Sequence, residues 1–281
     1  MVNNIFDTYG TPILIGLFII FFALETKFQL RKRVQGRWKR IVINFIVSIP
    51  AFALLRLLFI PAMLWLAFKN QQWQFGLNYL FSAPQWVYLA LSFLLLDYSN
   101  YAWHILLHKL PFMWRFHLVH HSDLDLDITT AFRFHFGEMI GSIFFRGAAV
   151  VLTGASPLLI IIYEIVFEAA TQFHHSNTKL PFRLEKILNY VIVTPRMHGI
   201  HHSMIKEETD SNYSVIFSFW DRIHKTVRLN IKQNEIVTGV PHYADEKELT
   251  IGNLLKMPFT KIREWKINER MVDDNVNQME R

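Results

Sequence analysis

The chain contains no cysteine among its 281 residues. This absence excludes disulfide frameworks, iron–sulfur clusters, thiolate zinc sites and cysteine nucleophiles. Charged residues are scarce as well, at 19% against roughly 25% in average soluble domains, while hydrophobic residues make up 52%. Any metal in this protein must therefore be held by nitrogen and oxygen atoms. The meaning of the hydrophobic excess depends on where in the chain the hydrophobic residues are concentrated.

Several common motifs are also missing. The HExxH pattern of zinc proteases and the GxGxxG fingerprint of dinucleotide-binding domains do not occur. Soluble di-iron bundles carry a glutamate three residues before a histidine, and the chain has no such pair. The apolar segments 8–24 and 41–96 hold no histidine, which argues against a membrane cytochrome b.

Three long apolar segments account for much of the hydrophobic content. Residues 8–24 and 70–96 carry no charge, and residues 41–68 carry one, although Pro50 and Pro61 interrupt that segment. A bilayer core takes about 20 mostly apolar residues per helix. We therefore expect three transmembrane helices in these segments.

A fourth apolar region covers residues 139–173 and has Gly154 and Pro157 near its middle. Two full crossings take about 40 residues, so we predict a tight hairpin of two short helices, with a single crossing as the alternative. Arg146 and Glu164 are costly in lipid and are expected to face protein or the interface.

Basic residues indicate the orientation. Residues 31–40 contain six basic residues and no acid. The positive-inside rule places this loop in the cytoplasm, and it assigns much of the +6 net charge to the membrane surface. No basic and aromatic nucleic-acid module is present, so no nucleic-acid partner is expected. Residues 251–264 are weakly amphipathic and suited to the membrane surface, and residues 269–281 are expected to be frayed.

Histidines form the strongest pattern, because eleven of the thirteen lie between positions 104 and 202. They include one HxxxH pair and two HxxHH boxes. Histidines three or four residues apart lie on one face of a helix, so their imidazoles reach the same ion. These eight residues are His104 and His108, then His117, His120 and His121, then His198, His201 and His202.

Metal binding explains this pattern better than packing does. Protonated imidazoles would repel one another, whereas coordination keeps them neutral. Eight or more nitrogen ligands exceed the needs of one ion, which favours two metals. An all-imidazole site suits iron, zinc or copper. A membrane metal transporter or another histidine-ligated metal enzyme is the alternative, but transport histidines lie near the middle of several helices.

The boxes HILLH (104–108), HLVHH (117–121) and HGIHH (198–202) resemble the eight-histidine pattern of the fatty acid hydroxylase/sterol desaturase superfamily. Neighbouring elements are similar too: DYSNYAWH, WRFHLVHHSD, FHHSN, TPRMHGIHHS and NYSVIFSFWDRIHKT. The resemblance covers roughly residues 90–226. It implies a membrane enzyme with two non-haem irons that uses O₂ and two electrons to hydroxylate or desaturate a lipid chain.

The same resemblance implies the ligands. The eight box histidines would bind iron, and His175 in the HSN element is a further expected ligand. His174 is an uncertain ligand, because adjacent residues on a helix point about 100° apart. His135 in RFHFGE departs from the family pattern, in which proline follows the histidine, so we expect it to lie behind the ligands. Catalytic residues beyond the metal ligands are not predicted.

Asp97 lies on the helical stripe of His104 and His108. We expect its carboxylate to accept the free N–H of a ligating imidazole or, alternatively, to lie at the interface. Arg196 and the Asp221–Arg222 pair are expected to hold helices together or order the histidine boxes.

The sequence thus predicts an all-α integral membrane protein with about four transmembrane helices or hairpins, forming one membrane domain over 1–281. Transmembrane helices occupy 8–102, a histidine-rich cytoplasmic cap 103–138 and 174–226, the hairpin 139–173, and a C-terminal surface segment 227–281. The hairpin returns the last histidine box to the face of the first two. Oxygenation implies a separate reductase or electron carrier, since the chain shows no redox domain. Sterol, fatty acyl, sphingoid and ether lipids all stay open as substrates.

Overall fold

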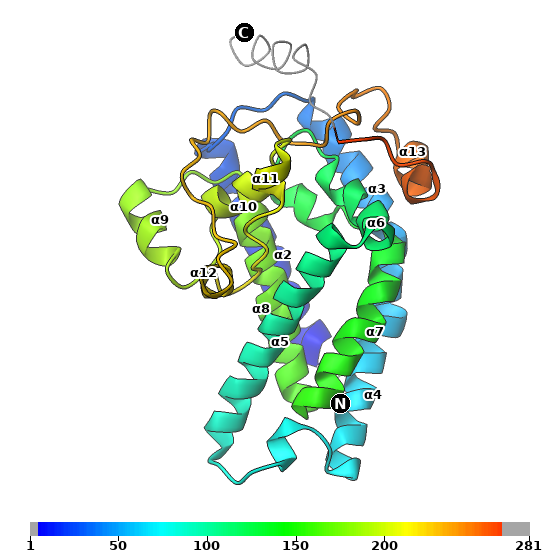
Figure 1. The fold of residues 1–281 in the computed structure, drawn as a ribbon, viewed down its shortest axis with the longest axis vertical. Helices are drawn as coiled ribbons and strands as arrows, with labels where there is room; N and C mark the ends of the chain where they lie inside the picture. The colour runs from blue at the N-terminus through cyan, green and yellow to red at the C-terminus, as the bar shows by residue number, and fades with distance from the viewer. Residues whose placement is uncertain (1–4, 266–281) are drawn as a thin grey trace.

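The computed structural model describes residues 5–265, and α-helices form its framework, with no named β-strand in that range (Figure 1). This confirms the predicted all-α class. The helices are α2 (Thr11–Lys27), α3 (Arg37–Leu54), α4 (Ile60–Trp73), α5 (Gln85–Lys109), α6 (Pro111–His121), α7 (Phe136–Thr153), α8 (Pro157–His175), α9 (Phe182–Leu188), α10 (Pro195–His201), α11 (Lys206–Thr209), α12 (Phe219–Ile223) and α13 (Ile251–Lys256).

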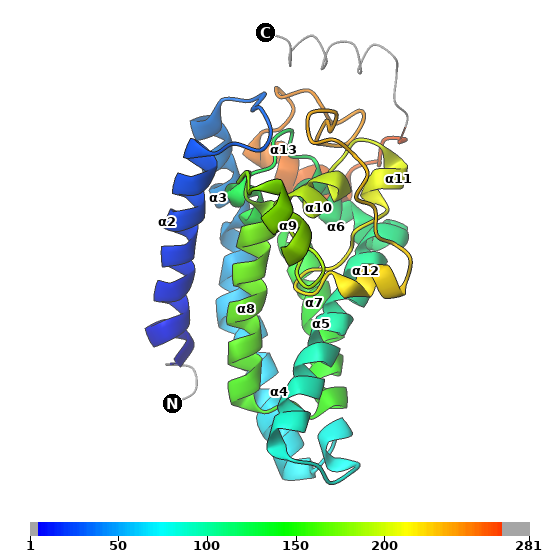
Figure 2. The same ribbon diagram turned by 90° about the vertical axis from the view of Figure 1, so that its left-hand side faces the viewer.

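The long helices lie side by side, and the short helices α6 and α9–α13 gather at one end of them as a cap (Figures 1 and 2). Four helical segments are long and apolar enough to cross a membrane, among the residues described. They are Phe6–Lys27, Arg37–Tyr79, Phe136–Thr153 and Pro157–His175. The protein is therefore an α-helical membrane protein with a histidine-rich cap.

The second apolar segment is one continuous helical path despite its prolines. A π-helical turn, Leu55–Phe59, joins α3 to α4. Pro61 lies two residues after the end of this turn, in the first turn of α4. A proline ring clashes with the carbonyl four residues earlier in a regular helix, and a π-turn displaces that carbonyl. The path therefore continues to Trp73.

The predicted span 70–96 is wrong in its bounds. Helix α4 ends at Trp73, the chain turns through residues 74–84, and α5 begins at Gln85 and continues to Lys109. Gly76 explains the reversal: its φ is 111°, and a Cβ there would lie 2.5 Å from the backbone nitrogen of Gly154. An uncharged run measures apolarity but not chain direction. Helix α5 is also absent from the four candidate spans, because its C-terminal half, which begins at Asp97 and leads into the cap, is polar.

The apolar region 139–173 forms two helices. Helix α7 ends at Thr153, Gly154 adopts a φ of 69°, and the Ser156 hydroxyl caps α8 by accepting from the Leu159 N–H. The hairpin brings the chain back to its starting end, because His135 precedes α7 and His175 ends α8. Its two helices pack against α4 around a core that includes Phe59, Met63 and Ile161.

Arg146 and Glu164 face protein, as predicted. They form an ion pair between α7 and α8, and both side chains are buried. The Arg146 guanidinium also lies over the rings of Phe59 and Phe167, 4.6 and 4.8 Å from their centroids. Charge pairing and cation–π contacts together offset the cost of a charged side chain in an apolar bundle.

A buried polar network fixes the loop that follows the first HxxHH box. Arg40 on α3 forms ion pairs with Asp123, at 2.7 Å, and with Asp127. Arg133 donates to the Val119 carbonyl at 2.8 Å and to Asn44 at 2.9 Å. Burial lowers the pKa of Arg133. Because breaking a buried pair typically costs about 3–5 kcal/mol, this network firmly holds the end of α6 against α3.

The C-terminal segment lies on the cap. Leu254 of α13 is fully buried and packs with Val47 and Leu118, so the weakly amphipathic segment 251–264 rests partly on protein. Phe259 beside it is exposed. The expected fraying at 269–281 lies outside the described residues, and the predicted domain bounds remain a prediction.

Candidate metal centre

Nine buried histidines form two adjacent groups at the junction of the long helices and the cap. Within each group, the candidate ligand atoms lie within 4.8 Å of one another. We name them cluster A, which is His104, His108, His117, His121 and His201, and cluster B, which is His120, His175, His198 and His202. They are the nine residues predicted as ligands, brought together from α5, α6, α8 and α10.

The helical periodicity explains how the boxes divide. In the α6 box, His117 and His121 are one turn apart and enter cluster A, while His120 points into cluster B. The α10 box does the reverse, since His198 and His202 enter cluster B and His201 enters cluster A. Neighbouring residues on a helix point about 100° apart. Each HxxHH box therefore supplies a pair to one cluster and a single ligand to the other.

Hydrogen bonds to the outer ring nitrogens orient several of these imidazoles. The Nδ1 of His104 lies 2.8 Å from the Tyr213 carbonyl, that of His201 2.7 Å from the Ser211 carbonyl, and that of His175 2.8 Å from the Thr171 carbonyl. Carbonyl oxygens only accept, so each Nδ1 carries the proton and each Nε2 is left with a lone pair. This is the arrangement of a metal-ligating histidine.

His117 is oriented by a carboxylate, since its Nδ1 lies 3.1 Å from Oε2 of Glu138. Its Nε2 lies 3.2 Å from Nε2 of His104. Two imidazole nitrogens at this distance share a cation between them, either a metal ion or a proton. Sequence reasoning missed Glu138, although it is the last residue of the RFHFGE element that contains His135.

The donor set fits a pair of metal ions. In cluster B, the Nε2 of His198 lies 2.9 Å from that of His175 and 3.1 Å from that of His202. A metal bound to imidazole at about 2.0–2.1 Å places neighbouring ligand atoms about 3 Å apart. In cluster A, both ring nitrogens of His108 and His121 are buried without a hydrogen-bond partner. Such orphaned nitrogens are rare in proteins unless an ion or water satisfies them.

The electrostatics of the clusters favour neutral imidazoles. Burial lowers the pKa of His120, His121, His198, His201 and His202 well below the ordinary value, and the neighbouring imidazoles lower it further. Neutral imidazole is the form that binds metal. Burial thus favours, for these five imidazoles, the neutral form that coordination requires.

Asp97 takes a different place from the one predicted. Its carboxylate accepts from the backbone N–H groups of Ile216 and Phe217, at 3.3 and 3.2 Å, and from Nε1 of Trp220 at 2.8 Å. It contacts no imidazole. Seven residues of α-helix advance about 10 Å, so Asp97 is too far from His104 and instead anchors the segment between α11 and α12 to α5.

Asp221 anchors the same loop and also supports the metal centre. It accepts from the N–H groups of Tyr213 and Ser214, both at 2.9 Å, and from the Thr226 hydroxyl at 2.6 Å. Tyr213 supplies the carbonyl that orients His104. Asp221 therefore helps to order the histidines, as predicted, and Arg196 joins α10 to α9 through Glu185.

The two remaining candidate histidines lie outside both clusters. The Nδ1 of His174 lies 3.1 Å from the Val215 carbonyl, although its ring is 4.2 Å from that of His198. His135 caps α7 by accepting from the Gly137 N–H, and its Nε2 lies 3.2 Å from the Leu255 carbonyl. His135 thus fixes the start of α7 and, with it, Glu138.

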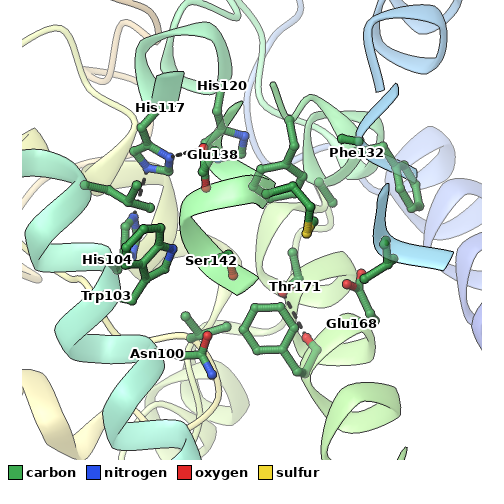
Figure 3. Close-up of a pocket in the computed structure, with 18 of the residues that line it drawn as sticks. Asn100, Trp103, His104, His117, His120, Phe132, Glu138, Ser142, Glu168 and Thr171 are labelled. Carbon is green, nitrogen blue, oxygen red and sulfur yellow. Dashed lines mark hydrogen bonds and ion pairs between the residues drawn. The ribbon is translucent and has the colours of Figure 1, made fainter. Parts of the chain in front are cut away.

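A cavity leads from the histidines into the membrane-spanning part of the molecule (Figure 3). His104, His117 and His120 line one end of it. Its walls come from α3, α5, α7 and α8 and from the segment that follows α6, and they are mostly apolar. Apolar lining residues include Phe52, Leu55, Leu107, Phe132 and Phe167.

Comparison with known proteins gives the family. The family model for fatty acid hydroxylases matches residues 89–226. The chain belongs to the fatty acid hydroxylase/sterol desaturase superfamily. This confirms the resemblance drawn from the histidine boxes. The matched segment begins on α5, ends after α12 and encloses both clusters.

Three relatives within this superfamily illustrate how similar the chain is to known proteins. An alkylglycerol monooxygenase of Danio rerio is 29% identical over 63% of this chain and 38% of its own length. One from Xenopus tropicalis is 32% identical over 54% of this chain and 32% of its own. A cholesterol 25-hydroxylase of Rattus norvegicus is 24% identical over 57% of this chain and 53% of its own. The chain thus spans about a third to a half of these relatives. No solved structure matches it significantly.

Glu138 is expected to tune metal affinity. Replacing Glu138 by alanine removes the acceptor of the His117 Nδ1–H, so metal affinity should fall about 10–100-fold. Glu138→Gln keeps an accepting oxygen and should restore part of the loss. Metal titration of the full-length protein measures this effect. Wild-type affinity in Glu138→Ala would mean that Glu138 does not position His117.

Proposed function

We propose that this protein is an O₂-dependent lipid hydroxylase with two irons, one in cluster A and one in cluster B. The observation that carries the proposal is the pair of all-histidine clusters at the end of an apolar cavity in a membrane protein. The names of the relatives, monooxygenase and hydroxylase, support oxidation of a lipid, and family membership supports iron.

The reaction is RH + O₂ + 2e⁻ + 2H⁺ → ROH + H₂O, in which the lipid C–H bond breaks and a C–OH bond forms. An unactivated C–H bond has no acidic proton, so side-chain acids and bases cannot break it. When bound, the irons would supply the reductive activation of O₂. Desaturation would begin with the same bond, but the relatives' names favour hydroxylation.

The chain's own groups would hold the ions and the substrate. The nine cluster histidines would coordinate, while Glu138 and the carbonyls of Thr171, Ser211 and Tyr213 fix their rings. Phe132 and Phe134 line the cavity beside His120, and the Phe134 ring stacks on that imidazole with 5.1 Å between centroids. These apolar walls would guide a hydrocarbon chain and exclude water from the reacting carbon.

Electrons would come from a separate reductase or carrier. The sequence holds no cysteine for an iron–sulfur cluster and no dinucleotide fingerprint. A basic loop on the cap, with Arg31 buried against α10, lies on the same end as the clusters. A soluble donor would reach the metals from this side.

We place the cap in the cytoplasm. Six basic residues in the segment 31–40 lie in the loop after α2 and in the first residues of α3, at the cap end of both helices, which satisfies the positive-inside rule. Tyr9, Trp73 and Trp86 are exposed at the opposite ends of the helices, where an aromatic belt meets the outer interface. Under this proposal, residues 1–281 act as one membrane domain with the predicted cap segments 103–138 and 174–226.

Single engineered cysteines test this orientation without background, because the natural chain has none. Glu207→Cys, in the cap, should react with a membrane-impermeant maleimide only after the cytoplasmic side is opened. Gln71→Cys, at the far end of α4, should react in intact cells. The reversed pattern would place the cap outside.

Oxygen labelling tests the proposed reaction. Cells that produce the wild-type chain are incubated under ¹⁸O₂, and their lipids are compared with those of a His198→Ala strain by mass spectrometry. We expect a wild-type-specific lipid that carries one ¹⁸O atom. A new double bond without label would indicate desaturation instead. Metal flux through vesicles with no lipid oxidation would support a transporter and contradict the proposal.

A further inference from the structure

The cavity has an unexpected polar patch on its membrane side. Glu168 lines the cavity from α8, within the apolar segment Pro157–His175. Its carboxyl group forms no hydrogen bond or ion pair with any residue in the described part of the chain, and its nearest cation, Arg146, is already paired with Glu164. A carboxyl group at membrane depth is expensive and therefore usually serves a function.

Two further oxygen atoms beside the cavity lack protein partners. Ser142, on α7, lines the cavity and makes no hydrogen bond to the described residues. Asn100, on α5, donates from Nδ2 to the Leu96 carbonyl at 3.1 Å and to the Tyr163 hydroxyl at 2.6 Å, which leaves its Oδ1 unused. Together with Glu168, these groups offer mainly hydrogen-bond acceptors to whatever occupies the cavity.

The helical register places this patch away from the metal clusters. Asn100 precedes His104 by four residues, and Ser142 follows Glu138 by four. Glu168 precedes His175 by seven. These offsets correspond to about 6 Å and about 10 Å along the helix axes. Figure 3 shows Asn100, Thr171 and Glu168 on the side of the cavity away from His117 and His120.

The charge of the patch selects among ligands. Glu164 and Glu168 supply two carboxyl groups against the single guanidinium of Arg146, so the patch has no spare positive charge for a carboxylate or phosphate. A neutral hydroxyl, in contrast, donates to Glu168 or to Oδ1 of Asn100 and accepts from Ser142. An alcohol therefore suits this patch, because its single O–H donates to one of the two acceptors while its oxygen accepts from Ser142.

We propose that Glu168, with Ser142 and Asn100, binds the hydroxyl group of a lipid alcohol inside the membrane-spanning part of the cavity. This inference rests on the proposed function and extends it. It makes the substrate a hydroxylated lipid rather than a free fatty acid. It also places the oxidised carbon about one to two helical turns from that hydroxyl, that is about 6–10 Å.

Equilibrium binding of two tritiated probes, 1-hexadecanol and palmitic acid, to the full-length protein in nanodiscs tests the subsite. The wild type should bind the alcohol at least tenfold more tightly than the acid. Glu168→Leu should lower alcohol affinity at least tenfold and leave acid affinity unchanged or higher. Glu168→Gln should keep most of the alcohol affinity, because its amide oxygen still accepts.

Two matched variants separate binding from folding. Ser142→Ala is a small truncation on α7 and should weaken alcohol binding about threefold, because it removes one neutral hydrogen bond. Thr153→Val removes a hydroxyl of the same helix that bonds to the Ala149 carbonyl instead, and it should have no effect. All variants should bind the same amount of metal as the wild type.

Two results would overturn the subsite. One is that Glu168→Leu binds 1-hexadecanol as tightly as the wild type does, and the other is that the wild type binds palmitic acid more tightly than 1-hexadecanol. The outcome is separable from the proposed function. Alcohol binding that depends on Glu168 without any ¹⁸O-labelled lipid would contradict the hydroxylase and keep the subsite. An ¹⁸O-labelled lipid, with no preference of the protein for the alcohol over the acid, would support the hydroxylase and contradict the subsite.

Discussion

His120→Ala should remove the metal ion of cluster B and reduce lipid oxidation to less than a hundredth of the wild-type rate. His120 is one of only four candidate ligands in that cluster, and its Nε2 lies 3.1 Å from Nε2 of His175. Loss of a residue that merely orients a ligand typically costs about 10–100-fold, so loss of a ligand should cost more. Cluster A keeps all five of its histidines in this variant.

The measurement is metal content per chain together with oxidised lipid, made on the same purified preparations. His201→Ala is the reciprocal variant and should empty cluster A while cluster B keeps its four histidines. His224→Ala is the matched control, because His224 is exposed and belongs to neither cluster. Wild-type metal content and turnover in His120→Ala would refute the ligand assignment.

Acid should unfold the metal-free protein steeply below pH 6.5. The pKa values of His120, His121, His198, His201 and His202 are lowered in the folded state, so these residues stay neutral there while the unfolded chain takes up protons. Their effect on stability is absent above the unfolded pKa of about 6.5 and grows as the pH falls below it.

The free energy of unfolding of the metal-free protein is expected to change steeply with pH. Each of these five histidines lowers the free energy of unfolding by about 1.4 kcal/mol per pH unit below pH 6.5, so together they contribute up to about 7 kcal/mol per unit. Bound metal competes with protons for the same nitrogens, so the metal-loaded protein should keep its stability to lower pH. Acid should therefore release the metal first and unfold the chain afterwards.

Chemical unfolding in detergent micelles between pH 7.5 and 5.5 checks this expectation. The double variant His121→Asn, His201→Asn should show a slope smaller by about two protons, because asparagine does not titrate. A free energy of unfolding that is constant over this range in the metal-free wild type would contradict the buried, neutral state of the clusters.

The histidine pattern was sufficient to predict the clusters because helical spacing determines which side chains share a face. The positions of His104 and His108, or of His198 and His202, need only the 3.6-residue repeat. The same repeat separates one histidine of each HxxHH box from the other two, but which cluster each of them joins depends on how the imidazoles of the two boxes pack together. No local rule in either segment specifies that packing.

The missed features depend on contacts between distant segments. Glu138 meets His117 only because the chain folds back after α6, and the carbonyls of Ser211 and Tyr213 carry no side-chain signal at all. The prediction for Asp97 failed for a related reason. Its stripe on α5 was identified correctly, but a loop from residues 216–220 occupies the space beside it.

The membrane segments show the same limit. Apolar runs indicated how much chain enters the bilayer, yet the run 70–96 crosses a reversal at Gly76 that hydropathy does not register. The hairpin within 139–173 was predictable because Gly154 and Pro157 mark its turn.

Metal stoichiometry tests the central claim most directly. Full-length protein purified from iron-supplemented cells is analysed by mass spectrometry for iron, zinc and copper per chain, beside His120→Ala and His201→Ala. We predict two irons per wild-type chain and about one in each variant. A single metal ion per wild-type chain, or the same stoichiometry in all three proteins, would contradict the account of two histidine clusters that each hold one iron.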